Sequence, residues 1–186
     1  MIQKIFLSLT SILMMALVSV SLVACGDDDD DNGGGGNSSS SGLKVNANYG
    51  FFHKNSSTSW ELYFFSHDVT SASVVGKAVD VVAIELETKS GSDNIPEGEF
   101  TGCFAVDVVK GMKASQNGKG SDGEYYESGS RSKTTGRLTI KKNSGNNYTV
   151  SYTGVNFYGD DSNTPTIENA SFSFTGTILD YPMSNK

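Results

Sequence analysis

Hydrophobic and polar residues alternate along much of the chain beyond residue 43. The alternation is clearest in residues 60–65, 148–153 and 171–178. Because successive side chains of a strand point to opposite faces, this pattern predicts β-strands with one buried face and one face in water. No apolar period of 3.6 residues persists for three turns, so we expect helices to be few and short.

Other segments predict further strands, which brings the expected number to about eight. They lie near residues 45–52, 79–87, 98–109, 124–127 and 136–141. Turn-forming residues separate the strands, such as Pro96-Glu97-Gly98 and the run Asn143-Ser144-Gly145-Asn146-Asn147, which is short enough for a hairpin. The strand from Val79 to Leu86 is apolar on both faces, which predicts that it is covered on both sides.

Short turns between sequential strands favour an antiparallel meander. About eight strands must either close on themselves or pack as two layers, because free strand edges would pair with other chains. We therefore predict an all-β fold, a small barrel or barrel-like sandwich, formed by a single domain over residues 43–186.

The N-terminal segment, residues 1–24, has the pattern of a secretory signal peptide. Lys4 precedes an apolar run from Ile5 to Val20, and the small residues Val23 and Ala24 follow. A membrane-spanning helix needs about 20 consecutive apolar residues. The run is shorter than that, so an uncleaved anchor helix is the weaker alternative.

The sequence Leu22-Val23-Ala24-Cys25 resembles the lipobox of bacterial lipoproteins. This resemblance implies that diacylglycerol is attached to the Cys25 thiol, that the leader is removed, and that the new amine is acylated. Two or three acyl chains hold a protein stably on a membrane, whereas one chain is marginal. The partner implied by this motif is therefore a membrane, reached through the N-terminal lipid.

The acidic run that follows resembles the export tag of surface lipoproteins of the Bacteroidetes; it comprises Asp27, Asp28, Asp29, Asp30 and Asp31. The resemblance implies an outer-membrane protein that faces the cell exterior. The alternative is that this run of charges is solvated and does not direct export. Residues 26–42 contain only Asp, Asn, Gly and Ser, so residues 25–42 form a lipidated tether whose flexible part spans roughly 20 to 25 Å.

The folded part resembles a module found in surface lipoproteins of gut Bacteroidetes. The resemblance rests on five segments: Trp60-Glu61-Leu62-Tyr63-Phe64, Ile95-Pro96-Glu97-Gly98-Glu99-Phe100-Thr101, Gly136-Arg137-Leu138-Thr139-Ile140, Tyr148-Thr149-Val150 and Phe174-Thr175-Gly176-Thr177-Ile178. It implies a secreted, lipid-anchored, all-β domain and provides no catalytic residues.

Charge and cysteine content exclude several functions. The net charge is −7, and five of the 21 acidic side chains lie in the tether, so the domain is mildly acidic and does not suggest a nucleic-acid-binding protein. Lipidation of Cys25 leaves Cys103 without an intramolecular partner, so no disulfide is expected. His53 and His67 lie outside compact zinc-ligand spacing, and we predict no metal site and no cofactor.

No motif for catalysis is present, and Glu85 with Glu87 is interpreted as solubilising charge at a strand end. Aromatic residues expected near loops are the candidates for ligand binding: Tyr125, Tyr126, Phe157 and Tyr158. Aromatic faces with polar tips suit sugar rings and protein partners. We expect a non-enzymatic surface module that binds glycans. A structural or protein-interaction lipoprotein of the outer membrane is the alternative, and a hydrolase is a weaker one.

Overall fold

The computed structural model describes residues 43–114, 120–158 and 165–181. Cys25 and the acidic run 27–31 lie outside these residues. Within them the fold is all-β, with one 3-10 turn, η1 (Ala72–Val74). The strands are β1 (Tyr49–Lys54), β2 (Ser59–Phe65), β3 (Ala78–Glu87), β4 (Gly98–Phe100), β5 (Phe104–Ala114), β6 (Gly120–Ser121), β7 (Glu124–Glu127), β8 (Arg137–Ser144), β9 (Asn147–Phe157) and β10 (Ile167–Asp180). The predicted all-β class is confirmed.

The strands form one sheet in the order β4-β8-β9-β10-β1-β2-β3-β5-β6, and β7 pairs with β5. Neighbouring strands run antiparallel except β1 and β10, which are parallel with Gly50 opposite Ile178. Two predictions are therefore wrong. The sheet is mixed and is not a pure antiparallel meander, and it does not close into a barrel.

The physical reason is pairing between distant segments. β10, the last strand, adds to the free side of β1, the first strand, and brings β9 and β8 with it. β4 follows β3 in the sequence but pairs with β8, with Glu99 opposite Thr139. The single strand predicted over residues 98–109 is thus two strands, because Gly102, with φ +65°, turns the chain between them.

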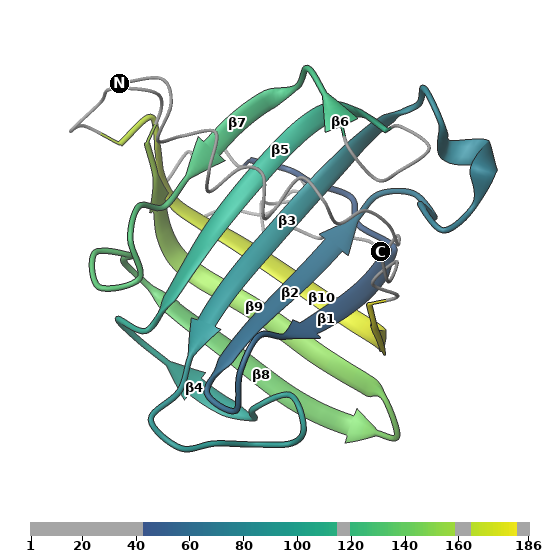
Figure 1. The fold of residues 1–186 in the computed structure, drawn as a ribbon. Helices are drawn as coiled ribbons and strands as arrows, with labels where there is room; N and C mark the ends of the chain where they lie inside the picture. Colours follow the sequence, from purple (N-terminus) through teal and green to yellow (C-terminus); the bar gives the residue numbers. More distant parts are fainter. Residues whose placement is uncertain (1–42, 115–119, 159–164, 182–186) are drawn as a thin grey trace, which may run out of the picture.

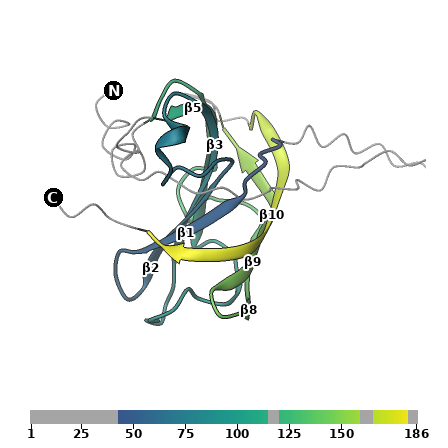
Figure 2. The ribbon, with the colours of Figure 1, turned by 90° about the vertical axis from the view of Figure 1, so that its right-hand side faces the viewer.

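The two halves of the sheet face each other across the main hydrophobic core. Figure 1 shows β1, β2, β3 and β5 crossing in front of β8, β9 and β10, and Figure 2 shows the same two layers from the side. Aromatic rings join the layers: the Phe64 ring lies 4.8 Å from that of Phe174 and 5.1 Å from that of Phe172, between ring centroids. Each such fully buried side chain stabilises the fold by about 1.5 to 3 kcal/mol.

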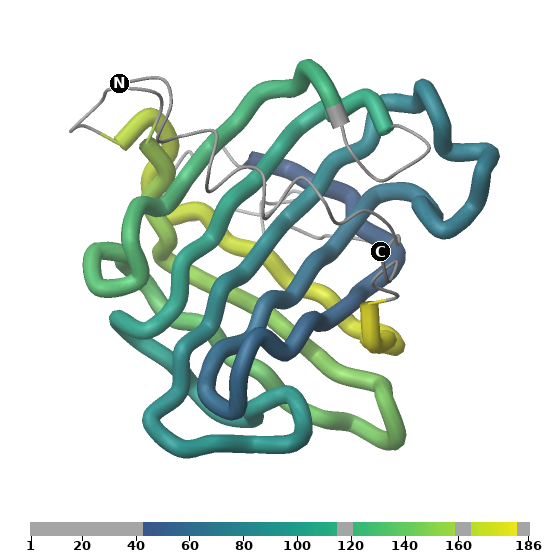
Figure 3. Tube along the Cα trace, viewed as in Figure 1, coloured from purple at the N-terminus to yellow at the C-terminus, as the bar shows by residue number. Residues whose placement is uncertain are grey.

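A second hydrophobic cluster lies on the outer face of the front layer. β3 contributes to both clusters, since Val82 and Ile84 point to the main core while Val81 and Ala83 belong to the outer cluster. The β2–β3 connection, which leaves one end of the sheet in Figure 3, carries η1 and places Val74 in the outer cluster. The prediction that this strand is covered on both sides is confirmed.

A β-bulge interrupts the pairing of β3 with β5. Asp80 on β3 stands opposite two residues of β5, Lys110 and Gly111. The Asp80 carboxylate forms an ion pair with Lys110 and accepts a 2.8 Å hydrogen bond from the Gly111 backbone N–H. Because the bulge adds one residue, Met112 points to the outer cluster rather than to the main core.

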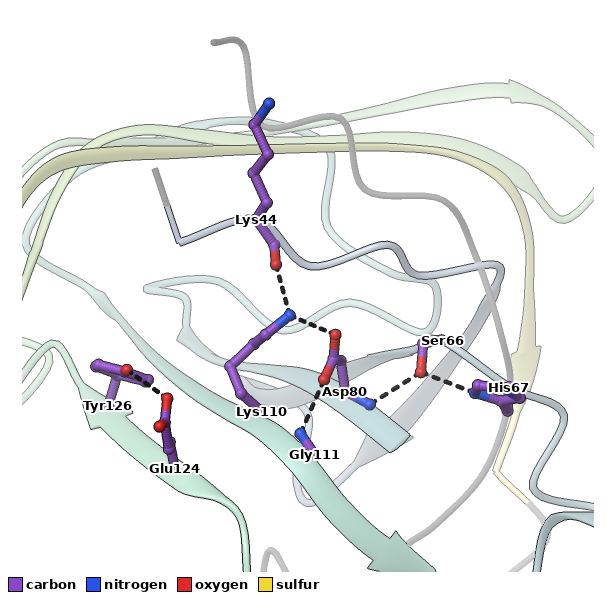
Figure 4. A network of polar contacts seen from close by, with 8 residues as sticks. All are labelled: Lys44, Ser66, His67, Asp80, Lys110, Gly111, Glu124 and Tyr126. Carbon is purple, nitrogen blue, oxygen red and sulfur yellow. Dashed lines mark hydrogen bonds and ion pairs between the residues drawn. The ribbon is translucent and has the colours of Figure 1, made fainter. Parts of the chain in front are cut away.

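Figure 4 shows that the bulge also holds two neighbouring segments. Lys110 Nζ donates to the backbone carbonyl of Lys44 at 2.6 Å, and the backbone N–H of Asp80 donates to Ser66 Oγ at 2.9 Å. Ser66 Oγ in turn lies 3.0 Å from Nδ1 of His67. The start of the described chain and the β2–β3 connection are therefore both fixed to the same point of the front layer.

Candidate polar groove at the end of β3

An open groove of about 570 Å³ lies at the C-terminal end of β3. Three connections meet there: the residues after β3, the turn between β4 and β5, and the loop after β7. The lining residues are Glu87, Thr88, Lys89, Gly102, Cys103, Ser130, Arg131 and Ser132. Six of these eight residues have charged or hydroxyl side chains, so the groove can form hydrogen bonds with a polar ligand.

Two carboxylates of β3 hold the Arg131 side chain in one position. Arg131 Nη1 donates to Glu87 Oε2 at 2.7 Å, and Arg131 Nε lies 3.5 Å from Glu85 Oε2. Glu85 and Glu87 lie on the same face of β3 because they are two residues apart. The guanidinium is therefore fixed at the edge of the groove before any ligand arrives.

The loop that carries Arg131 is fixed at its base. Ser128 and Thr134 are the buried polar residues of the described chain. Ser128 Oγ accepts a 2.8 Å hydrogen bond from the Val106 backbone N–H and lies 3.0 Å from Thr134 Oγ1. The Thr134 backbone N–H donates to the Ser130 carbonyl at 3.0 Å and closes the turn. A loop held in this way loses little conformational entropy when it binds a ligand.

A surface of carboxylates and tyrosines adjoins the groove on the outer face of the front layer. It contains Glu61 and Tyr63 of β2, Glu85 of β3, Asp107 of β5, and Tyr125 and Glu127 of β7. Tyr63 donates a hydrogen bond to Glu61 Oε2. Burial, together with Glu61, raises the pKa of Tyr63 above its usual range, so this phenol stays protonated and acts as a donor.

Asp107 is the most strongly perturbed carboxyl of this surface. Burial raises its pKa to about 7, the nearby Glu85 and Glu127 charges add to the rise, and a hydrogen bond from Tyr125 opposes it. Burial also raises the pKa of Glu85, against the lowering effect of Arg131. A carboxyl that holds its proton near neutral pH could exchange protons with a substrate. Neither Asp107 nor Glu85 lines the groove, however, so a ligand in the groove would not contact these two carboxyls.

The four aromatic residues predicted to bind a ligand do not form one exposed platform. Tyr125 and Tyr126 point to opposite faces of β7, since they are successive residues of one strand and Tyr126 contacts the main core. The Tyr126 hydroxyl donates to Glu124 at 2.9 Å, as Figure 4 shows. Tyr158 is half-buried and pairs through its backbone with Glu127.

Phe157 requires a correction, because it is fully buried in the main core and offers no surface to a ligand. It follows the inward alternation of β9, where its ring centroid lies 6.2 Å from that of Tyr152. A role of Tyr125, Tyr126 and Tyr158 in binding stays a prediction.

The remaining residues singled out from the sequence are dispersed. Cys103 is half-buried, unpaired among the described residues, and lines the groove. His53 lies on β1 opposite Glu61, and His67 lies beyond β2. In the described ranges, no three side chains of His, Cys, Asp or Glu could jointly hold a metal ion.

Sequence reasoning missed Arg131 and the serines beside it. The segment Ser128-Gly129-Ser130-Arg131-Ser132-Lys133 has the composition of an ordinary solvent-exposed loop. The available signal was Glu85 and Glu87, two like charges on one strand face, which need a cation nearby. They were interpreted as solubilising charge, whereas in the structure they bind Arg131.

No family model, curated protein or solved structure matches this chain. Among the described residues, no helix is long and apolar enough to cross a membrane.

Proposed function

We propose that this protein is a lipid-anchored module of the outer-membrane surface that binds glycans outside the cell. Its anchor is Cys25, and residues 27–31 direct it to the exterior, as the resemblance to surface lipoproteins implies. The groove at the end of β3 is the binding site. The observation that supports this site most is the fixed position of Arg131, held by Glu85 and Glu87 on a loop with a buried polar base.

A preorganised polar groove suits sugars for a physical reason. Each sugar residue carries several hydroxyls that both donate and accept hydrogen bonds, and the groove presents hydroxyls, a guanidinium and a carboxylate within one concave surface. Since Arg131 is already held by Glu85 and Glu87, little binding free energy is spent on ordering its side chain.

A protein-interaction role and a hydrolase activity have less support. A protein-docking surface is expected to carry a contiguous apolar patch. In the described part of the chain, the large exposed apolar side chains are Tyr49, Val75 and Leu179, which is a small set. Glycoside hydrolysis usually requires two carboxyls at the scissile bond, and the perturbed pair Glu85 and Asp107 lies outside the groove lining.

A glycan array probed with the full-length protein in detergent tests this proposal. We expect binding to a restricted set of glycans, and we expect Arg131→Ala to abolish or strongly weaken it. Arg137→Ala is the matched control, because Arg137 forms a similar exposed pair with Glu99 at 3.0 Å on a different strand. An array without signal above background, or equal losses in both variants, would contradict the proposal.

A further inference from the structure

The groove places two cations, Lys89 and Arg131, beside one carboxylate, Glu87. Lys133, two residues beyond Arg131, is exposed on the same loop. Among the described residues Lys89 forms no ion pair, so its ammonium group is available to an incoming anion. The lining carries two positive charges and one negative charge, so its net charge favours an anion over a neutral sugar.

Arg131 retains donors for a ligand while it is held by β3. A guanidinium carries five N–H donors in a planar fork. In the described structure its contacts with Glu85 and Glu87 involve Nε and Nη1. The Nη2 donors are not used by these contacts, and guanidinium N–H groups form strong hydrogen bonds to anionic oxygens such as those of a carboxylate.

Hydroxyl groups flank the two cations. Ser130 and Ser132 stand on either side of Arg131, and their Oγ atoms lie 3.5 Å apart. Thr88, next to Lys89, uses its hydroxyl proton internally, because its Oγ1 contacts the carbonyls of Ser90 at 2.9 Å and Thr58 at 3.3 Å. The two serines are therefore the hydroxyls best placed for a sugar ring.

We propose that the groove binds the carboxylated sugar residue of an acidic polysaccharide, with its carboxylate between Arg131 and Lys89. This inference rests on the proposed function and names the class of glycan. Ser130 and Ser132 bond to the ring hydroxyls beside the carboxylate. Glu87 stands at the same groove and repels the anion.

The test compares charged polysaccharides with neutral partners of the same backbone. The full-length protein in detergent is titrated by calorimetry with polygalacturonate, alginate and hyaluronan, and with the methyl ester of each acid, which lacks the charge. We expect at least one of the three acids to bind, and esterification to weaken binding by about tenfold or more. Binding should also weaken as sodium chloride rises, because salt screens exposed charges.

Variants then assign the charge effect to named residues. Arg131→Ala and Lys89→Ala should each weaken binding of the acid by about tenfold, while Arg137→Ala leaves it within about twofold. Arg131→Lys keeps the charge but loses the planar set of N–H donors. Its affinity for the acid should therefore lie between that of the parent and that of Arg131→Ala. Glu87→Gln should strengthen binding, since the repelling charge is gone while Gln Oε1 still accepts from Arg131. Circular dichroism of each variant verifies that the fold persists.

The outcomes separate this inference from the proposed function. Binding of neutral glycans alone, or equal affinity for the acid and its ester, overturns the acidic-sugar inference and leaves glycan binding intact. Weaker binding by the Glu87→Gln variant also overturns the acidic-sugar inference. If none of the three acids binds, the inference falls, and if the glycan array is blank as well, the proposed function falls with it.

Discussion

Asp107 of β5 and Tyr125 of β7 are diagonal neighbours across this strand pair, on the outer face of the front layer. Burial raises the pKa of Asp107 to about 7, and the Tyr125 phenol beside it opposes the rise. Burial also raises the pKa of Tyr125, so the phenol stays protonated at every physiological pH.

This pair predicts a dependence of stability on pH. An Asp carboxyl in the unfolded chain ionises near pH 4, while folded Asp107 holds its proton up to about pH 7. The folded state therefore binds more protons between these values, so the stability that Asp107 contributes is complete below about pH 4 and is lost as pH rises to about 7. Asp107→Asn lacks this charge and can still accept from Tyr125.

We expect Asp107→Asn to be more stable than the parent at pH 8, by up to a few kcal/mol, with the difference shrinking toward pH 4. Urea unfolding at several pH values measures this. Glu168→Gln, an exposed position on β10, is the control and should behave as the parent. A constant difference between Asp107→Asn and the parent across the range would refute the burial argument.

Ser128→Ala should destabilise the domain by about 1 to 3 kcal/mol, because the buried Val106 backbone N–H loses its acceptor. Ser132→Ala, at an exposed position of the same loop, should change the free energy of unfolding by less than about 0.5 kcal/mol. Denaturant unfolding of both variants checks this. Equal effects would mean that the Ser128 hydrogen bond does not fix the loop.

Gly136→Ala should be strongly destabilising, by roughly 3 kcal/mol or more. Gly136 has φ +82°, and a Cβ there would lie 2.2 Å from the Thr153 carbonyl oxygen, so β8 and β9 would have to separate. Gly145, in the β8–β9 hairpin, has φ +53° with open space around it, so Gly145→Ala should cost only about 1 kcal/mol. The midpoints of thermal unfolding should follow this order, and the reverse order would contradict it.

The lipid anchor is tested at Cys25. Cys25→Ala should release the protein from the membrane fraction, because about 0.8 kcal/mol per buried CH₂ of the acyl chains is lost. Cys103→Ala, the control at the other cysteine, should remain in the membrane fraction. Mass spectrometry of the mature N-terminus should show the lipid on Cys25. An unmodified Cys25, or a Cys25→Ala protein that still sediments with membranes, would contradict the proposal that Cys25 is the lipid anchor.

The location of the domain on the outside of the cell is tested separately. External protease should digest the domain on intact cells, and replacing Asp27–Asp31 with Ala should protect it until the outer membrane is broken. Cells permeabilised beforehand provide the control for protease activity. Unchanged exposure after the replacement would show that the acidic run is not an export tag.

The local pattern of the sequence was sufficient for many of the strands. The segments predicted near residues 79–87 and 124–127 match β3 and β7 nearly residue for residue, and the doubly apolar run from Val79 to Leu86 indicated a strand covered on both faces. These properties depend on neighbouring residues alone, because the face a side chain occupies is set by its position along its own strand.

Only the tertiary structure decided how the strands pair and where the site lies. The parallel pairing of β1 with β10 and the antiparallel pairing of β4 with β8 both depend on which arrangement buries the whole set of apolar faces. The inserted residue at the Asp80 bulge reverses the side-chain alternation in β5 without any change in composition. Arg131 meets Glu87 across 44 residues of sequence because the turn after β7 returns the chain to the end of β3. Periodicity along one strand holds no information about such contacts, since they are selected by the free energy of the complete fold.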